Sequence, residues 1–503
     1  PTAGARRPCP EPATAPVNKR IRRLGIFLLA CYVALFAMLN YIQVLQADSL
    51  NDNEFNARGT FENLSRPRGT IETADGVVVA RSVPVDDRIG LQREYPEGDL
   101  FGHITGFFPV NGRATGVERQ YNEELAGQTF EQELRSFADL FVDRDRTGNV
   151  TLTLRDDVQR VARDQLGQRR GSIVVLDVDT GGIVAMWSYP SYDPNPLSSH
   201  DAQAARDAFN FLDPTSGQSP LRASSYQNTF FPGSTFKVVT GSTGVQSGRV
   251  TPEAPVYPSV TSYTPPQTTR PLSNFAGEVC GGALFAILAK SCNTSFAQMG
   301  AETLGPDIMV DGAASFGFNQ VPPIDLPGAV ESRFPVDFAD NLPALAQASI
   351  GQGDTSATPL QMALVAQAVA NEGRMMAPHV MQEIRDGEGA VVEDEPVDVW
   401  KTPISAASAA TMRDAMYGVV DNGTLTGVAD IPGFQVGGKT GTAQTGNDTN
   451  NTWVIEFVGP PGEKPKYAIA VIVENQGPDE TGGGVAGPIA NAVLTQALQG
   501  DAG

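Results

Sequence analysis

Three short motifs contain residue types that could perform nucleophilic catalysis without a histidine. The first, Ser234-Thr235-Phe236-Lys237, follows a turn at Pro232-Gly233. If a helix begins at Ser234, the lysine three residues later lies one turn up the same face, with its amine beside the hydroxyl. A serine hydroxyl is a weak nucleophile at neutral pH and needs such an adjacent base. Taken alone, this motif also fits a helix-capping serine and a solvated lysine.

Two later motifs decide in favour of the catalytic interpretation. Ser291-Cys292-Asn293 comes just after the end of an expected helix. Lys439-Thr440-Gly441-Thr442 lies inside a strand expected over residues 435–444. Each triplet is common by itself. All three in this order, with enough chain between them to build one α/β domain, indicate a single catalytic centre.

The residue types in these motifs suggest a role for each side chain. Lys237 can act as the base if burial and the nearby charge of Lys439 lower its pKa. Ser291 can relay a proton between the lysines and a leaving amine, and Asn293 can hydrogen-bond a substrate amide. We therefore expect a serine nucleophile, Ser234, that works with neither a metal nor a cofactor.

The edge of the strand that carries Lys439 is the expected substrate-binding surface. An extended peptide can pair with this edge by strand addition, and Gly441 leaves room for the peptide to lie close. Thr440 and Thr442 project from the same face of the strand and can bind a terminal carboxylate. The backbone N–H groups of Ser234 and Thr442 would form an oxyanion hole.

The composition argues against several other classes of protein. The chain has 503 residues, of which 41% are hydrophobic and 18% charged, as is typical of a globular protein with two or more folded units. Its net charge of -21 argues against nucleic acid as a partner, because binding it needs a basic face. There are three histidines, His103, His200 and His379, and no G-x-S-x-G partner for a serine–histidine triad.

The four cysteines do not have the C-x-x-C spacing of a zinc site. Cys9 and Cys31 precede or lie within an apolar N-terminal stretch. Cys280 and Cys292 lie far downstream and could form a disulfide if that region is oxidised. The sequence leaves the paired and the free state equally open.

An apolar stretch near the N-terminus is long enough to cross a membrane. Residues 25–45 follow the basic segment Lys19-Arg20-Ile21-Arg22-Arg23, and a helix of about 20 residues spans the hydrocarbon core of a bilayer. The basic flank predicts a cytoplasmic N-terminus and an extracytoplasmic remainder. A cleaved signal peptide is the alternative, but the stretch is long for one and no clean cleavage site follows. We expect an uncleaved, single-pass anchor in the cell membrane.

The chain divides into four predicted parts. These are a cytoplasmic tail (1–24), the transmembrane anchor (25–45), a mainly β membrane-proximal module (46–150) and a catalytic domain (151–503). In the module, residues 69–80 fit two strands joined by an Asp75-Gly76 turn. In the catalytic domain we expect hairpins over 173–187 and 451–473. A terminal helix is expected over 488–498, with Pro488 in its first turn and the Gly482-Gly483-Gly484 run before it as a turn.

From about Arg66 to the C-terminus, the chain resembles the class B penicillin-binding proteins, most closely the penicillin-binding protein A group of actinobacteria. S-x-x-K, S-x-N and K-T-G in this order are a signature set of penicillin-binding proteins and serine β-lactamases. Further matches to the family pattern are Arg68-Gly69-Thr70-Ile71 and Gly351-Gln352-Gly353-Asp354. The turn at residues 72–76 departs from the Asp-Arg-Asn-Gly sequence frequent there, which leaves the contacts of the outer module open.

The resemblance implies an α/β (α+β) fold of the penicillin-binding and β-lactamase type, with an antiparallel sheet flanked by helices. It also implies a D,D-transpeptidase that cross-links peptidoglycan. Ser234 would attack the penultimate D-Ala carbonyl of a stem peptide, and the amine of a neighbouring stem would take the acyl group. β-Lactams, which mimic D-Ala-D-Ala, would acylate Ser234. The implied protein partner is a membrane glycosyltransferase of the SEDS type.

Two other functions fit the same motifs. A D,D-carboxypeptidase or a β-lactam-hydrolysing enzyme would use the same serine, although an anchor and an outer module suit a diffusible hydrolase poorly. A scaffold that activates a SEDS glycosyltransferase would need the fold and little catalysis. We predict the transpeptidase, acting in cell wall synthesis for growth or division.

Overall fold

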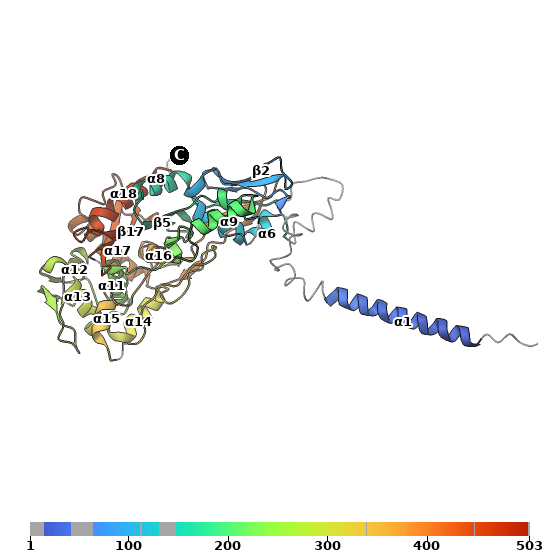
Figure 1. Ribbon diagram of the computed structural model, residues 1–503. Coiled ribbons are helices and arrows are strands. Elements are labelled where there is room, and N and C mark those ends of the chain that lie inside the picture. The colour runs from blue at the N-terminus through green and yellow to red at the C-terminus, as the bar shows by residue number, and fades with distance from the viewer. Residues whose placement is uncertain are drawn as a thin grey trace, which may run out of the picture. The chain divides into compact units, whose positions relative to one another are not determined.

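The computed structural model describes residues 15–41, 64–110, 113–129, 147–338, 340–446 and 448–500. Contacts divide the chain into two units, Pro1–Asn63 and Leu64–Gly503 (Figure 1). Residues 1–14 of the predicted tail, residues 42–45 of the predicted anchor and the start of the predicted module at 46–63 lie outside the described residues.

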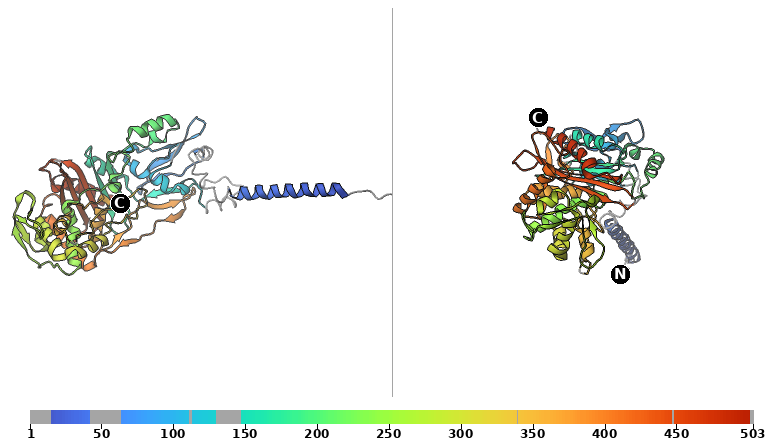
Figure 2. Two further views of the ribbon diagram at one scale, coloured as in Figure 1. Left: turned by 60° about the horizontal axis from the view of Figure 1, so that its bottom comes forward. Right: turned by 90° about the vertical axis from the view of Figure 1, so that its left-hand side faces the viewer.

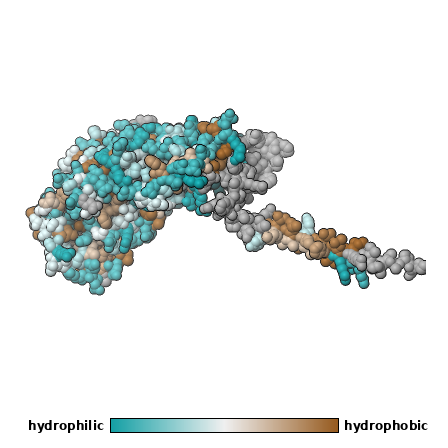
Figure 3. Space-filling view, viewed as in Figure 1, coloured by the Kyte–Doolittle hydropathy of each residue, from teal (hydrophilic) through white to brown (hydrophobic). Residues whose placement is uncertain are grey.

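The first unit contains one long apolar helix, α1 (Ala15–Asn40). Its segment Ile21–Asn40 has a mean hydropathy of 1.9 and no buried surface, and hydrophobic side chains run along the face seen in Figure 3. A helix of this length and composition can cross the hydrocarbon core of a bilayer. It is consistent with the predicted membrane anchor.

The second unit is built around a five-stranded sheet in the order β15-β16-β17-β5-β6, with every neighbouring pair antiparallel. In Figure 2, the strands from the C-terminal part of the chain (orange to red) lie beside the strands formed by residues 171–189 (teal). The predicted hairpins and the predicted antiparallel sheet are confirmed. The five strands are β5 (Gly171–Asp177), β6 (Ile183–Tyr189), β15 (Gln435–Gln444), β16 (Asn450–Gly459) and β17 (Tyr467–Gln476).

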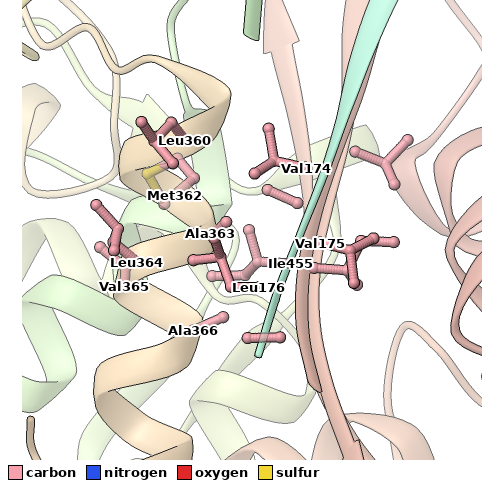
Figure 4. Packing of buried hydrophobic residues seen from close by; sticks show 14 of the residues in the cluster. Val174, Val175, Leu176, Leu360, Met362, Ala363, Leu364, Val365, Ala366 and Ile455 are labelled. Atoms are coloured by element: carbon pink, nitrogen blue, oxygen red, sulfur yellow. The ribbon is translucent and has the colours of Figure 1, made fainter. Parts of the chain in front are cut away.

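Helices cover both faces of this sheet (Figure 1). One face is covered by α8 (Asp156–Leu166) and α18 (Gly482–Gln499), and the other by α16 (Pro359–Ala370). Every residue of α16 is buried, which explains why the helix is apolar apart from Gln361 and Gln367. Both glutamine side chains donate to backbone carbonyls. Figure 4 shows side chains of α16, among them Leu360 and Ala363, packed towards Val174 and Leu176 of β5.

A group of helices and short strands beside the sheet carries two of the three motifs. The helices are α10 (Ser224–Gln227), α11 (Lys237–Gln246), α12 (Leu284–Ala289), α13 (Asn293–Gln298), α14 (Gly305–Ser315), α15 (Leu342–Ala348) and α17 (Ala406–Asn422). Helix α9 (Ala202–Phe211) lies apart from them and packs on the 3-10 turn Asn195–Ser198 (Figure 1). The short strands are β7 (Tyr257–Val260), β8 (Ser262–Tyr263), β9 (Leu272–Ser273), β10 (Cys280–Gly282), β11 (Met375–Met376) and β14 (Val399–Lys401).

A second, six-stranded sheet has the order β13-β12-β4-β1-β2-β3. Four of its strands come from the early part of the chain, and β12 and β13 come from the part predicted as catalytic domain. Antiparallel pairing of β12 with β4 joins the two parts. The strands are β1 (Ile71–Glu72), β2 (Val78–Pro84), β3 (Leu91–Glu94), β4 (Asn149–Leu152), β12 (Met381–Arg385) and β13 (Val391–Asp394), accompanied by short helices α4 (Gly102–Thr105), α5 (Gly116–Gln120) and α6 (Asn122–Leu125).

A buried charge cluster holds this module together and explains the arginine of the Arg68-Gly69-Thr70-Ile71 match. Glu118 Oε2 accepts a hydrogen bond from Arg68 Nε at 2.5 Å, and Glu118 Oε1 accepts one from Arg93 Nε at 2.6 Å. All three side chains are buried. Burial by itself would raise the pKa of Glu118, but the two guanidinium groups outweigh it and leave the pKa below its usual value.

The divergent turn at residues 72–76 contacts the catalytic half. Both carboxylate oxygens of Asp75 accept from the backbone N–H of Asp156, at 3.0 and 3.1 Å. This N–H belongs to the first turn of α8, where backbone donors have no partner within the helix. Asp75, which belongs to the outer module, therefore caps the N-terminal end of α8.

The prediction for the C-terminal helix is wrong at its beginning. Helix α18 starts at Gly482, and Pro488 lies inside it. The Thr481 hydroxyl accepts from the Gly484 N–H at 3.2 Å and caps the helix. A Cβ on Gly482 would stand 2.2 Å from the Trp453 carbonyl oxygen. Only a glycine fits at position 482, where the first turn of α18 packs against the sheet.

Candidate active site

The predicted nucleophile lies on a tight turn that two glycines make possible. Ser234 belongs to a 3-10 turn, Gly233–Phe236, and α11 begins only at Lys237. Gly233 has a φ of +54°, and its N–H donates to the Gly351 carbonyl at 3.0 Å. A Cβ on Gly351, whose φ is +73°, would stand 2.2 Å from the Gly233 oxygen. Gly351 of the match at 351–354 therefore supports the nucleophile turn.

The structure brings the three motifs together around Ser291. Lys237 Nζ donates to Ser291 Oγ at 3.2 Å, and Lys439 Nζ donates to the same Oγ at 2.8 Å. Both lysine side chains are fully buried. A single hydroxyl thus bridges two amines, as expected of a proton relay.

The environment of the two lysines disfavours a state in which both amines are charged. The pKa of Lys237 lies well below its usual 10.5, because the amine is buried and because Lys439 is close. Burial lowers the pKa of Lys439 to about 7. At neutral pH the pair can therefore hold one proton in place of two, which leaves one amine able to act as a base.

The resting contacts of Lys237 differ in one respect from the prediction. Its amine donates to the Ser291 carbonyl at 2.7 Å and to Asn293 Oδ1 at 2.6 Å. Among the described residues, Ser234 makes no side-chain hydrogen bond. Catalytic hydrogen bonds are often long in the unliganded enzyme and form only with substrate. Asn293 also donates to the Ser273 carbonyl at 3.1 Å. In the unliganded protein, Asn293 therefore links the Lys237 amine to the wall of the cleft.

A cleft of about 780 Å³ opens over this centre. Five of the predicted catalytic and substrate-binding residues line it, Ser234, Ser291, Asn293, Thr440 and Thr442, and so do both cysteines of the predicted pair. Lys237 and Lys439 lie buried beneath it. The alternation along β15 thus turns the two threonines towards the cleft and the lysine towards Ser291, as the strand period requires.

The structure shows a reason for the glycine at position 441 that the sequence did not reveal. A Cβ at this position would stand 2.9 Å from the Pro232 carbonyl oxygen and 3.0 Å from the Thr235 methyl group. The space left by the missing side chain is therefore occupied by the nucleophile turn. Gly441 lets Ser234 lie against the strand.

Cys280 and Cys292 form a disulfide, with their Cα atoms 5.5 Å apart. Cys280 lies on β10, and Cys292 immediately precedes α13. Asn274 supports the same wall, because its Oδ1 accepts from the Thr294 N–H at 3.0 Å. These contacts fix the Ser291-Cys292-Asn293 segment in the cleft.

Sequence reasoning missed Thr424, which lines the cleft and whose hydroxyl lies 2.7 Å from that of Thr440. A lone threonine in a loop has no pattern that would single it out.

The histidines lie away from the cleft: none of the three lines it in the described part of the chain. His103, for example, is buried against the Pro220 carbonyl, and burial lowers its pKa to about 4.

A further buried group is Glu456 on β16, opposite Gly438 of the motif strand. Neither carboxyl oxygen has a hydrogen-bond partner among the described residues. Burial raises the pKa of Glu456 to about 8. Burial therefore favours the protonated form of this carboxyl near neutral pH.

Two family descriptions match the chain. Residues 171–495 match "Penicillin binding protein transpeptidase domain", and residues 68–150 match "Penicillin binding protein A dimerisation domain". The chain is 37% identical to the peptidoglycan D,D-transpeptidase PbpA of Mycolicibacterium smegmatis, over 96% of this chain and 99% of the relative. It is 35% identical to the PbpA of Mycobacterium tuberculosis, over 96% of this chain and all of the relative.

Solved structures of penicillin-binding protein A also resemble this chain. The imipenem acyl-enzyme complex of penicillin-binding protein A from M. tuberculosis superimposes with a TM-score of 0.79 at 33% identity, covering 87% of this chain and 100% of that one. The penicillin G acyl-enzyme complex of the same protein gives a TM-score of 0.78 at 34% identity, covering 86% and 100%.

Proposed function

The chain belongs to the class B penicillin-binding proteins, and we propose on that basis that it is a peptidoglycan D,D-transpeptidase working through Ser234. The observation that carries this proposal is the pair of buried lysines that share the Ser291 hydroxyl next to the Ser234 turn. Such a pair supplies a base to a serine without a histidine. The M. tuberculosis relative forms acyl-enzymes with imipenem and penicillin G.

In the first half-reaction, neutral Lys237 accepts the Ser234 hydroxyl proton, and Ser234 Oγ attacks the penultimate D-Ala carbonyl carbon. The N–H groups of Ser234 and Thr442 stabilise the oxyanion. The nearness of the two segments supports this assignment, since a Cβ on Gly233 would lie 3.0 Å from the Thr442 oxygen. As the C–N bond breaks, Ser291 passes a proton to the leaving amine of the terminal D-Ala.

In the second half-reaction, the amine of a neighbouring stem peptide attacks the acyl-serine carbonyl. This amine gives up a proton through the same relay, the new amide forms, and Ser234 regains its hydroxyl proton. Thr440 and Thr442 bind the terminal carboxylate of the donor peptide during the first half-reaction. A β-lactam presents a carboxylate and a strained amide to the same groups and leaves Ser234 acylated.

The anchor and the outer module set where this chemistry takes place. The basic residues Lys19, Arg22 and Arg23 precede the apolar part of α1, and the positive-inside rule then puts the N-terminus in the cytoplasm and the catalytic unit outside. We retain the division into tail, anchor, module and catalytic domain at residues 24, 45 and 150. A SEDS-type glycosyltransferase is the partner that the family resemblance suggests for the anchor and module.

The test is the fate of the acyl group. The full chain in detergent is given a stem pentapeptide ending in D-Ala-D-Ala, with and without an acceptor amine, and the products are separated by mass. We expect D-Ala release and a cross-linked product that dominates when the amine is present. Hydrolysed tetrapeptide as the main product in both cases would indicate a carboxypeptidase. Turnover of penicillin within seconds, in place of an adduct that persists for hours, would indicate a β-lactamase.

A further inference from the structure

Thr424 and Thr440 form a hydroxyl pair in the lining of the cleft. Their Oγ1 atoms are 2.7 Å apart, and both residues line the cleft. Thr440 is the threonine of the K-T-G motif and one of the two proposed carboxylate ligands. Thr424 comes from a different element, the loop that follows α17. The contact therefore joins a substrate-binding hydroxyl to a residue outside the three motifs.

The backbone of Thr424 is held firmly on two sides. Its N–H donates to the Ala289 carbonyl, at the end of α12, at 3.2 Å. A Cβ on Gly423 would stand 2.4 Å from that same carbonyl oxygen, and a Cβ on Gly483 would stand 2.6 Å from the Thr424 oxygen. Thr424 is thus packed between α12 and the first turn of α18. The position of its hydroxyl is set by elements that already border the cleft.

The direction of the hydrogen bond between the two hydroxyls decides what Thr440 can offer a substrate. Each hydroxyl has one proton, and a carboxylate only accepts hydrogen bonds. If Thr440 donates to Thr424, it has no proton left for a carboxylate. If Thr424 donates to Thr440, the Thr440 proton is free to point into the cleft. A bound carboxylate favours the second arrangement, because hydrogen bonds to charged groups are the stronger ones.

We propose that Thr424 is a positioning residue that donates its hydroxyl proton to Thr440 Oγ1 and thereby directs the Thr440 proton to the terminal carboxylate of the donor substrate. The proposal rests on the proposed function, because it concerns the substrate of that site. In this proposal, Thr424 makes no contact with the reacting carbonyl. Its effect should therefore depend on whether the substrate carries a carboxylate.

The test compares Thr424→Val, which keeps the shape and removes the hydroxyl, with Thr424→Ser, which keeps the hydroxyl. The rate constant for acylation of the full chain is measured with penicillin G and with penicillin G methyl ester, which lacks the carboxylate. We expect Thr424→Val to slow acylation by the acid about tenfold and acylation by the ester less than about twofold. Thr424→Ser should restore the rate with the acid. If Thr424→Val does not fold, Thr424→Ala takes its place.

A double-mutant cycle with Thr440→Val tests whether Thr424 acts through Thr440. We expect Thr440→Val to slow acylation by the acid, and Thr424→Val to add no further loss in that background. Equal slowing with acid and ester, no slowing at all, or fully additive losses would each overturn the proposal. A wild-type chain that penicillin G does not acylate would instead contradict the proposed function itself.

Discussion

Replacing Lys237 with methionine should slow acylation of Ser234 by penicillin about 10²–10⁴-fold, the usual contribution of a general base. Methionine has a similar length and no amine, so the Ser234 proton loses its acceptor. The matched control is Lys401→Met, a lysine on β14 beside the Trp400 ring and outside the residues that line the cleft. It should leave the rate constant within about twofold of wild type, because Lys401 is half-buried on a strand that contributes no residue to the lining of the cleft.

The pH dependence of acylation separates Lys237 from an ordinary lysine. A base must be neutral, so the rate constant should rise with pH until Lys237 has lost its proton and then level off. Because burial and the nearby charge of Lys439 hold the pKa of Lys237 well below its usual 10.5, we expect the rate constant to level off well below the pH at which an ordinary lysine loses its proton. A rate constant that keeps rising about tenfold per pH unit above pH 9 would contradict this role.

Replacing Glu118 with glutamine should lower the free energy of unfolding by about 3–5 kcal/mol, because the substitution leaves two buried guanidinium groups without their anion. Arg68 and Arg93 both bond to this carboxylate, and Arg68 also donates to the Glu118 carbonyl at 2.7 Å. The amide of glutamine cannot neutralise either charge. Chemical denaturation of the full chain in detergent measures the effect.

Glu94→Gln is the matched control for Glu118→Gln. Glu94 pairs with Arg81 at 2.8 Å in the same module, but the side chains keep 40% and 50% of their surface exposed. Exposed ion pairs contribute about 0–1 kcal/mol, so the loss should be within that range. Similar losses for the two variants would show that the buried cluster does not stabilise the module.

The chemistry of the cleft could be predicted from the sequence because it depends on residue types that few other roles require together. A serine, two lysines and a second serine in three short motifs define a relay, and the structure joins them through Ser291 Oγ. The antiparallel sheet could be predicted as well, since its hairpins are continuous apolar runs joined by turns.

Contacts between distant segments could not be predicted from local patterns. The pairing of β12 with β4, the cap that Asp75 places on α8 and the Thr424–Thr440 contact each join segments that no periodicity connects. Packing also overrode local preference at Gly482, where the sequence favours a turn and close approach to Trp453 requires a helical glycine. The close packing at Gly441 could not be predicted either, because the Pro232 carbonyl and the Thr235 side chain that leave no room for a Cβ come from a distant segment.

The central claim is that Ser234 is the nucleophile of a penicillin-sensitive transpeptidase, and the mass of the acylated protein tests it most directly. The full chain and its Ser234→Ala variant are incubated with penicillin G, and the intact masses and the modified peptide are determined. We expect one penicilloyl group, on the peptide that contains Ser234, and no adduct on the variant. An adduct of equal amount on Ser234→Ala, or an unmodified wild-type chain, would contradict the claim.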